Sequence, residues 1–249
     1  MSLPAVSDLT IPDSRLVLRS RLGALTLVLL CAVQFLDIVD AAIVNVALPS
    51  IQHSLGFSQQ SLQWVASGYI LTYGGFLLLG GRLSDLLGRR RMLLIGLAVF
   101  GVSSLIAGLS QEAWLLVAAR LVQGLGAALM APAALSELTV SFREGKDRNT
   151  ALGIWGAISG MAAAAGVFLG GVLSQGPGWR WVFFVNPPIC AVVAVGALVL
   201  LAHDRGARAE GTTFDSQGAV LVTGACCCWC TASCGHRLSA GDRSRPSSR

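Results

Sequence analysis

Charged residues are scarce in this sequence of 249 residues. Asp, Glu, Lys and Arg make up 12% of the chain, hydrophobic residues make up 54%, and the mean hydropathy is +0.68. A soluble domain carries about 25% charged residues, so the composition excludes an ordinary soluble domain. The net charge of +5 could suggest nucleic-acid binding, but the basic residues are confined to alternate connections between apolar runs. That pattern is typical of membrane proteins, so we expect a lipid bilayer as a partner and no nucleic acid.

The sequence also lacks the patterns that carry catalysis or hold a metal ion. It contains no Ser-His-Asp, metal-ligand or phosphate-binding constellation, so an enzyme in the membrane is the weakest alternative and no cofactor is expected. Five of the seven cysteines lie close together near the end of the chain: Cys226, Cys227, Cys228, Cys230 and Cys234. They lack the ordered pairs of a zinc site and fall in an apolar run, so no metal is expected there.

Six apolar runs are each long enough to cross a bilayer as a helix. About 20 helical residues at ~1.5 Å per residue cover the roughly 30 Å hydrocarbon core. The predicted spans cover approximately residues 22–48, 62–81, 92–111, 113–136, 150–174 and 181–202. We expect Pro49 to end the first span, because proline cannot continue the helical hydrogen bonding. A polar loop is expected over residues 137–149.

Four polar or atypical segments lie outside these spans. Residues 1–21 form a polar lead, and residues 203–215 form a polar loop. Residues 216–234 begin like a seventh spanning helix, but the composition changes abruptly from Gly224. Residues 235–249 form a polar tail with four arginines. We interpret the change as a reading-frame disturbance near residues 224–226, and a genuine Cys-rich basic C-terminus is the alternative that resequencing of the coding DNA would distinguish.

The basic residues indicate how the chain is oriented in the membrane. Lys and Arg occur in the lead, in residues 82–91, in residues 143–148 and in residues 205–208, whereas the three intervening connections hold only Arg180. Short loops rich in Lys and Arg stay on the cytoplasmic side. The sequence therefore predicts a multi-pass protein of the cell membrane with a cytoplasmic N-terminus.

Three charged residues fall inside the predicted spans: Asp37, Asp40 and Arg120. A charge at the centre of a spanning helix costs at least ~2.5 kcal/mol on insertion scales, so it needs an interior partner or a water-filled cavity. Asp40 is expected about 12 Å below the outer end of the first helix, and Arg120 about 10 Å below the same surface. The two are therefore expected to form an ion pair, with Asp37 on the same helical face and nearer the midplane.

This pair has a functional and a structural interpretation. The functional one is a cavity lined by a protonatable aspartate whose proton affinity is tuned by the arginine. The structural one is an ion pair that only positions two helices. Asn45 and Gln123 are further candidates for the same cavity, although amides also serve as interhelical hydrogen-bonding groups.

Glycines are concentrated in the fourth and fifth runs. Gly124 and Gly126 follow Gln123, and the fifth run contains Gly166, Gly170 and Gly171. Small residues spaced by four let helices approach closely. Dense helix packing and a moving gate are both consistent with this pattern.

Four motifs, taken together and in order, resemble the major facilitator superfamily. Residues 81–90, Gly-Arg-Leu-Ser-Asp-Leu-Leu-Gly-Arg-Arg, match its signature loop between helices two and three. Residues 116–126 are similar to the helix-four motif whose arginine is implicated in proton coupling. Residues 40–49 and 179–188 resemble the fourteen-helix drug:proton antiporter branch. Residues 166–171 depart from that branch, because they lack the proline that usually precedes the Gly-Gly pair.

The resemblance implies a fold and a function for the chain. The expected fold is an all-α integral membrane protein: the N-terminal six-helix half of a major facilitator fold plus an incomplete seventh helix. The expected function is proton-coupled efflux of drugs or other small molecules, with the proton gradient as energy source. An exporter of a native metabolite or amino acid, and a non-functional truncated fragment, are the alternatives, since the substrate site of such transporters lies between two halves.

The resemblance also implies roles for particular residues. Asp40 is the expected proton carrier, with Asp37 in reserve and Arg120 as the tuning charge. The hairpin between the second and third spans is expected to act as a gating loop that locks the cytoplasmic side through Gly81, Asp85, Gly88, Arg89 and Arg90.

Overall fold

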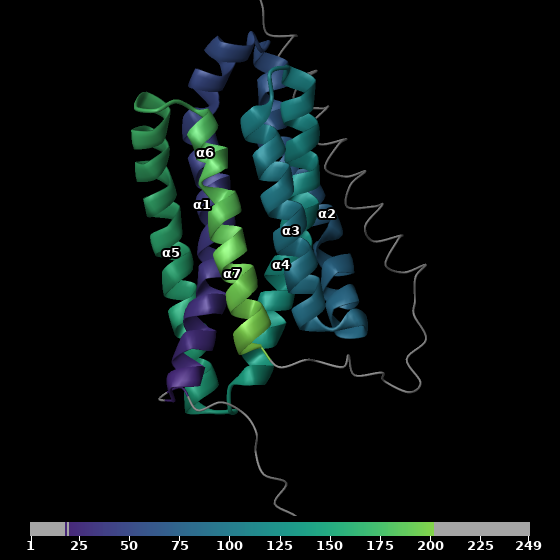
Figure 1. The fold of residues 1–249 in the computed structure, drawn as a ribbon, viewed down its shortest axis with the longest axis vertical. Coiled ribbons are helices and arrows are strands. Elements are labelled where there is room, and N and C mark those ends of the chain that lie inside the picture. The colour runs from purple at the N-terminus through teal and green to yellow at the C-terminus, as the bar shows by residue number, and fades with distance from the viewer. Residues whose placement is uncertain (1–17, 19, 202–249) are drawn as a thin grey trace, which may run out of the picture.

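The computed structural model describes residue 18 and residues 20–201, and this part of the chain contains six helical spans long and apolar enough to cross a membrane (Figure 1). The predicted all-α membrane fold is therefore confirmed. The helices are α1 (Arg21–Leu55), α2 (Gln59–Leu87), α3 (Arg89–Leu109), α4 (Ala113–Ser141), α5 (Lys146–Gln175), α6 (Arg180–Phe184) and α7 (Asn186–Leu200). The last two together form the sixth span.

Several predicted segments lie outside the described residues. They are most of the lead over residues 1–21, the loop over 203–215, the seventh helix over 216–234 and the tail over 235–249.

The prediction that Pro49 ends the first span is wrong, because α1 runs through Pro49 to Leu55. Proline removes one backbone hydrogen bond, but membrane helices tolerate such a loss where local adjustments satisfy the freed carbonyl group. The helix ends instead at Gly56, which adopts a left-handed conformation with φ 65° and donates its N–H to the Gln52 carbonyl at 3.0 Å. Glycine takes this conformation without the steric cost that a Cβ would impose.

The connections are shorter than the apolar runs predict. Gly88, with φ 97°, is the one residue between α2 and α3, so most of the charged stretch over 81–91 is helical rather than a loop. The polar loop expected over 137–149 is reduced to residues 142–145. Apolar runs end where the polar residues begin, but Glu, Lys and Arg are good helix formers, so the helices continue beyond the runs.

The sixth span is interrupted within its first third, whereas the sequence predicted a continuous helix over 181–202. Val185 separates α6 from α7, and Pro187 and Pro188 follow at the start of α7. Neither proline has a backbone N–H, so the carbonyl groups four residues earlier lose their helical partners. The Ser104 hydroxyl of α3 donates to one of these carbonyls, that of Phe183, at 3.0 Å.

The helices pack in two groups, with α4 against α2 and α3 and with α1 against α5 (Figure 1). Glycine allows the closest approaches. An ideal Cβ added at Gly126 would lie 2.7 Å from the Phe100 backbone nitrogen, and one added at Gly96 would lie 2.8 Å from the Gly126 carbonyl oxygen. The backbones of α3 and α4 therefore touch where no larger residue fits.

The glycines of α5 are not equivalent. A Cβ at Gly166 would lie 2.6 Å from Ala42 Cβ, and one at Gly170 would lie 2.9 Å from Val46 Cβ, so these two pack on α1. Gly171 takes no part in this contact, because a Cβ there meets no atom of the described residues within 4 Å. Consecutive helical residues point about 100° apart, so Gly171 cannot share the face of Gly170.

We expect Gly126→Ala to destabilise the bundle by about 1–3 kcal/mol, because the added methyl group would meet backbone atoms that cannot move aside. Gly160→Ala in α5 is the matched control, because a Cβ there meets nothing within 4 Å. It should stabilise the helix by about 0.5–1 kcal/mol. Thermal unfolding in detergent micelles measures both, and equal stability of the two variants would contradict the close contact of α3 with α4.

A polar cluster between the spans

The predicted ion pair between Asp40 and Arg120 is present and fully buried. Arg120 Nη1 of α4 lies 2.6 Å from Asp40 Oδ2 of α1, and the two side chains are 1% and 0% exposed. Arg120 Nη1 also donates to Gln123 Oε1 at 2.9 Å, and Gln123 Nε2 donates to Asp40 Oδ1 at 3.0 Å. These three residues therefore form a closed ring, in which the amide of Gln123 bridges the two charges.

Other spans contribute further groups to this ring. Arg120 Nε donates to the Val65 carbonyl of α2 at 3.2 Å. Asn186 Nδ2, at the start of α7, donates to Asp40 Oδ1 at 2.6 Å and to Ser104 Oγ of α3 at 3.0 Å. Within the described part of the chain, α5 is the one span with no group bonded to the ring or to Asn186.

Tyr69 connects the ring to the second aspartate. The Arg120 guanidinium lies over the Tyr69 ring, with its carbon 4.2 Å from the ring centroid. The Tyr69 hydroxyl donates to Asp37 Oδ1 at 2.5 Å, and Tyr73 stacks on Tyr69 with ring centroids 6.0 Å apart. Asp37 is thus held by a hydroxyl group, whereas Asp40 is held by a cation and two amides. We refer to Asp37, Asp40, Tyr69, Arg120, Gln123 and Asn186 as the polar cluster.

Because the polar cluster is buried, the loss of one of its ionic contacts lowers the stability of the fold. Removal of one partner from a buried ion pair costs about 3–5 kcal/mol, because the other charge is left uncompensated. Replacement of both charged residues by well-packed hydrophobic residues of similar volume is often neutral or stabilising. Asp40 and Arg120 are therefore individually costly to change and jointly replaceable.

Two of the predicted cavity and gating residues lie away from the polar cluster. Asn45 is exposed and donates its side-chain amide to the Ala41 carbonyl of its own helix at 2.8 Å, so the structure does not bring it to Asp40. Asp85 is exposed at the end of α2. In the same hairpin, Arg90 Nη2 donates to the Leu198 carbonyl at 2.7 Å, which links the start of α3 to the last turn of α7.

The glycines next to Arg120 place it between α2 and α3. A Cβ at Gly124 would lie 2.5 Å from the Tyr69 carbonyl oxygen, and Gly126 touches the α3 backbone at Phe100. These contacts bring α4 close enough for Arg120 and Gln123 to reach groups on both sides. Gly81 is less tightly packed, because a Cβ added there would lie 3.9 Å from its nearest neighbour, Pro132 Cβ.

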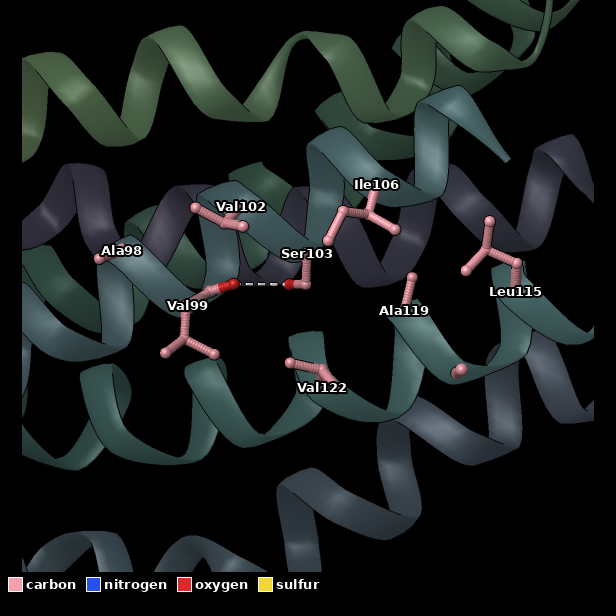
Figure 2. A pocket seen from close by; sticks show the side chains of 9 residues that line it. Ala98, Val99, Val102, Ser103, Ile106, Leu115, Ala119 and Val122 are labelled. Carbon is pink, nitrogen blue, oxygen red and sulfur yellow. Dashed lines mark hydrogen bonds between the residues drawn. The ribbon is translucent and has the colours of Figure 1, made fainter. Parts of the chain in front are cut away.

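A groove between α3 and α4 is unsuited to a polar ligand. The groove has a volume of about 480 Å³. Figure 2 shows side chains of both helices around it, including Val99, Val102, Ile106, Leu115 and Val122. Ser103 is its one hydroxyl residue, and that hydroxyl donates to the Val99 carbonyl of its own helix at 2.7 Å. The groove therefore offers no free polar group to a substrate.

No metal centre is found in residue 18 or residues 20–201, because no three His, Cys, Asp or Glu side chains gather there closely enough to hold an ion. The cysteine-rich segment over 226–234 lies outside the described residues.

The residue-by-residue reasoning missed Tyr69, Ser104 and Asn186 as members of this site. A tyrosine or serine in an apolar run has no periodic signature, so neither could be assigned to a face that meets Asp37 or Asn186. Asn186 did carry a signal, because an amide immediately before two prolines is a polar group at an expected helix irregularity.

Comparison with known proteins places the chain in a family. The sequence profile of the Major Facilitator Superfamily matches residues 30–234. The chain is 42% identical over 198 residues to the puromycin resistance protein pur8 of Streptomyces alboniger, and 46% identical over 197 residues to the cephamycin export protein CmcT of Amycolatopsis lactamdurans. These alignments cover 80% and 79% of this chain but 39% and 40% of the two relatives.

A third relative supports this assignment, and a solved structure shares the fold. The chain is 42% identical over 189 residues to the tetracenomycin C resistance and export protein of Streptomyces glaucescens, covering 76% of this chain and 35% of that protein. The crystal structure of a peptide transporter, POT, in complex with sulfate has the same fold with a TM-score of 0.69 at 16% identity, covering 86% of this chain and 46% of that one. The chain therefore belongs to the major facilitator superfamily.

Proposed function

We propose that this chain is the N-terminal portion of a proton-coupled exporter of drugs or other small molecules, of the fourteen-helix antiporter branch. The observation that carries the proposal is the polar cluster, in which two carboxyl groups and one guanidinium are buried among membrane-spanning helices. Ionisable residues inside a membrane are expensive, and they mark ion or substrate pathways more often than packing. The chain spans about 40% of its curated relatives, so the activity proposed is that of the longer protein.

The charge balance of the polar cluster supports an exchangeable proton. With Asp37, Asp40 and Arg120 all ionised the cluster carries one net negative charge, and one bound proton brings it to zero. Asp40 accepts hydrogen bonds from Arg120, Gln123 and Asn186, so a proton there would disturb the whole ring. Asp37 accepts from the Tyr69 hydroxyl instead. We therefore assign the exchangeable proton to Asp37 and the paired, tuning role to Asp40 with Arg120, which reverses the order expected from the sequence.

In the proposed mechanism, substrate and proton compete for the polar cluster during alternating access. Loss of the proton from Asp37 restores the net negative charge and favours either a cation-bearing substrate or reprotonation from the other side. The hairpin around Gly88 would act as the gating loop, and its bond from Arg90 to the Leu198 carbonyl would couple it to the sixth span.

The proposed location is the cell membrane with a cytoplasmic N-terminus. The segments rich in Lys and Arg, at the α2–α3 hairpin and over residues 143–148, lie at the same end of the bundle as the start of α1 (Figure 1). The positive-inside tendency supports a cytoplasmic position for this end.

A native product is the second candidate for the substrate. Two relatives are named for the export of cephamycin and for resistance to and export of tetracenomycin C. Export of a comparable small metabolite would use the same polar cluster, and a comparison of foreign dyes with native metabolites in one vesicle assay separates the two candidates.

Efflux driven by a pH gradient tests the proposal in inside-out vesicles. The chain is fused in frame to the remaining part of the cephamycin export relative, and the unfused chain is assayed beside it. We expect the fused protein to accumulate dye inside these vesicles, because an exporter in an inside-out membrane moves its substrate inward. The charge-neutral double variant Asp40→Asn/Arg120→Gln should stay folded, because both charges leave together, but should lose efflux. Asp40→Asn alone should cost about 3–5 kcal/mol of stability.

Two results would contradict this account. If the folded double variant transported dye at the rate of the parent protein, the ion pair would have only a structural role. Efflux by the unfused chain would show that the six spans need no second half.

A second prediction separates the roles of the two aspartates. Asp37→Asn still accepts the Tyr69 hydrogen bond, so its stability should change by less than about 1 kcal/mol. It should abolish gradient-driven efflux and leave the exchange of labelled for unlabelled substrate intact. Tyr69→Phe, which keeps the ring under Arg120 but removes the hydroxyl, should retain efflux with a changed pH profile. Gradient-driven efflux by Asp37→Asn at the parental rate would sink the assignment of the proton to Asp37.

A further inference from the structure

We propose that Asn186 is a positioning residue that ties the ionised Asp40 carboxylate to the interrupted segment of the sixth span. The significance of this link for transport rests on the proposed function. The link itself rests on contacts among Asp40, Asn186, Ser104 and Phe183.

Asn186 lies where the polar cluster meets the interruption. It is the first residue of α7, directly before Pro187, and it is 3% exposed. Its two amide hydrogens have separate acceptors, since Nδ2 donates to Asp40 Oδ1 at 2.6 Å and to Ser104 Oγ at 3.0 Å. An amide carries two N–H donors, so this one group holds α1 and α3 at the same time.

Ser104 extends the connection into the backbone of α6. Pro187 lacks the N–H that would bond the Phe183 carbonyl in a regular helix, and the Ser104 hydroxyl donates to that carbonyl at 3.0 Å. Hydrogen bonds thus join the Asp40 carboxylate through Asn186 and Ser104 to the carbonyl that proline leaves without a helical partner. The hydroxyl compensates for the interruption, and Asn186 orients the hydroxyl.

The face of α3 on either side of Ser104 is built for close contact with this segment. A Cβ at Gly101 would lie 3.2 Å from Cys190 Cβ, and one at Gly108 would lie 2.7 Å from the Phe184 ring. Residues three and four apart share a helix face, so Gly101, Ser104 and Gly108 form one surface. The interrupted segment therefore lies against a surface with a single side-chain hydrogen-bonding group.

The strength of the link depends on the charge of Asp40. Hydrogen bonds to an ionised acceptor are roughly twice as strong as those between neutral groups. Neutralisation of Asp40 therefore weakens the hold on Asn186, and with it the orientation of Ser104. The charged or titratable groups that face Asp40 are Asp37 on its own helix, Tyr69 on α2, Arg120 on α4 and the Cys190 thiol on α7. Arg120 donates to Asp40 Oδ2, so Arg120 and Asn186 bind the two oxygens of the same carboxylate.

Backbone hydrogen exchange in lipid nanodiscs tests the link on the full 249-residue chain. Mass spectrometry follows peptides covering residues 182–191 in four proteins: the parent, Asn186→Ala, the charge-neutral Asp40→Asn/Arg120→Gln, and the combination of all three substitutions. We expect exchange about tenfold faster in Asn186→Ala and in the charge-neutral variant. The combination should be no faster than Asn186→Ala alone, because both changes cut the same connection.

Independent, multiplying effects in the combined variant would overturn the proposal, since a merely structural asparagine would respond in that way. Parental exchange in Asn186→Ala would overturn it as well. Asn45→Ala is the matched control, because that amide bonds the carbonyl of its own helix and should leave residues 182–191 unchanged. If Asn186→Ala does not fold, Ser104→Ala replaces it in the same four-protein comparison, because it breaks the connection one step later.

This experiment needs no transport, so its result is distinguishable from that of the efflux assay. Loss of the link with intact gradient-driven efflux would refute the role of Asn186 alone. A confirmed link in a protein without efflux would refute the proposed function and leave the link in place.

Discussion

The need to satisfy a carboxylate and a guanidinium away from water governs this structure. Asp40 and Arg120 are almost completely buried, and each of their contacts is made by a group from another span or from the neighbouring turn. Without a partner, each such charge would destabilise the fold by several kcal/mol. The relative positions of α1, α2, α3, α4 and α7 are therefore tied to one another at a single ring of hydrogen bonds.

Small residues make this ring geometrically possible. Gly124 lets α4 approach the Tyr69 backbone on α2, and Gly126 lets it approach Phe100 on α3, so Arg120 and Gln123 project into the space between. Gly166 and Gly170 bring α5 against α1 behind Asp40. The hydrogen bonds of the ring therefore depend on the glycines, because larger residues would separate the helices beyond hydrogen-bonding distance.

The sequence was sufficient to predict the six spans and the pairing of Asp40 with Arg120. Hydropathy and helical rise fix span length and depth, and two opposite charges at equal depth need each other. The rest depended on tertiary contacts. Helices α1 and α4 extend beyond Pro49 and into polar residues, because helical backbone hydrogen bonds continue past the end of the apolar run. Asn45 and Gly171 do not meet the expected neighbours among the described residues, because a depth and a spacing do not tell which neighbour a side chain meets. Tyr69 and Ser104 act through partners far away in sequence.

The central claim is that the polar cluster holds one exchangeable proton on a carboxyl group that faces a hydroxyl rather than a cation. Infrared difference spectroscopy between acidic and alkaline pH, on the protein in lipid, detects a protonated buried carboxyl group directly by its carbonyl stretching band. The account predicts one such band that disappears in Asp37→Asn and survives in Tyr69→Phe at a shifted frequency. A band that survives in Asp37→Asn and disappears in Asp40→Asn, or the absence of any such band, would contradict it.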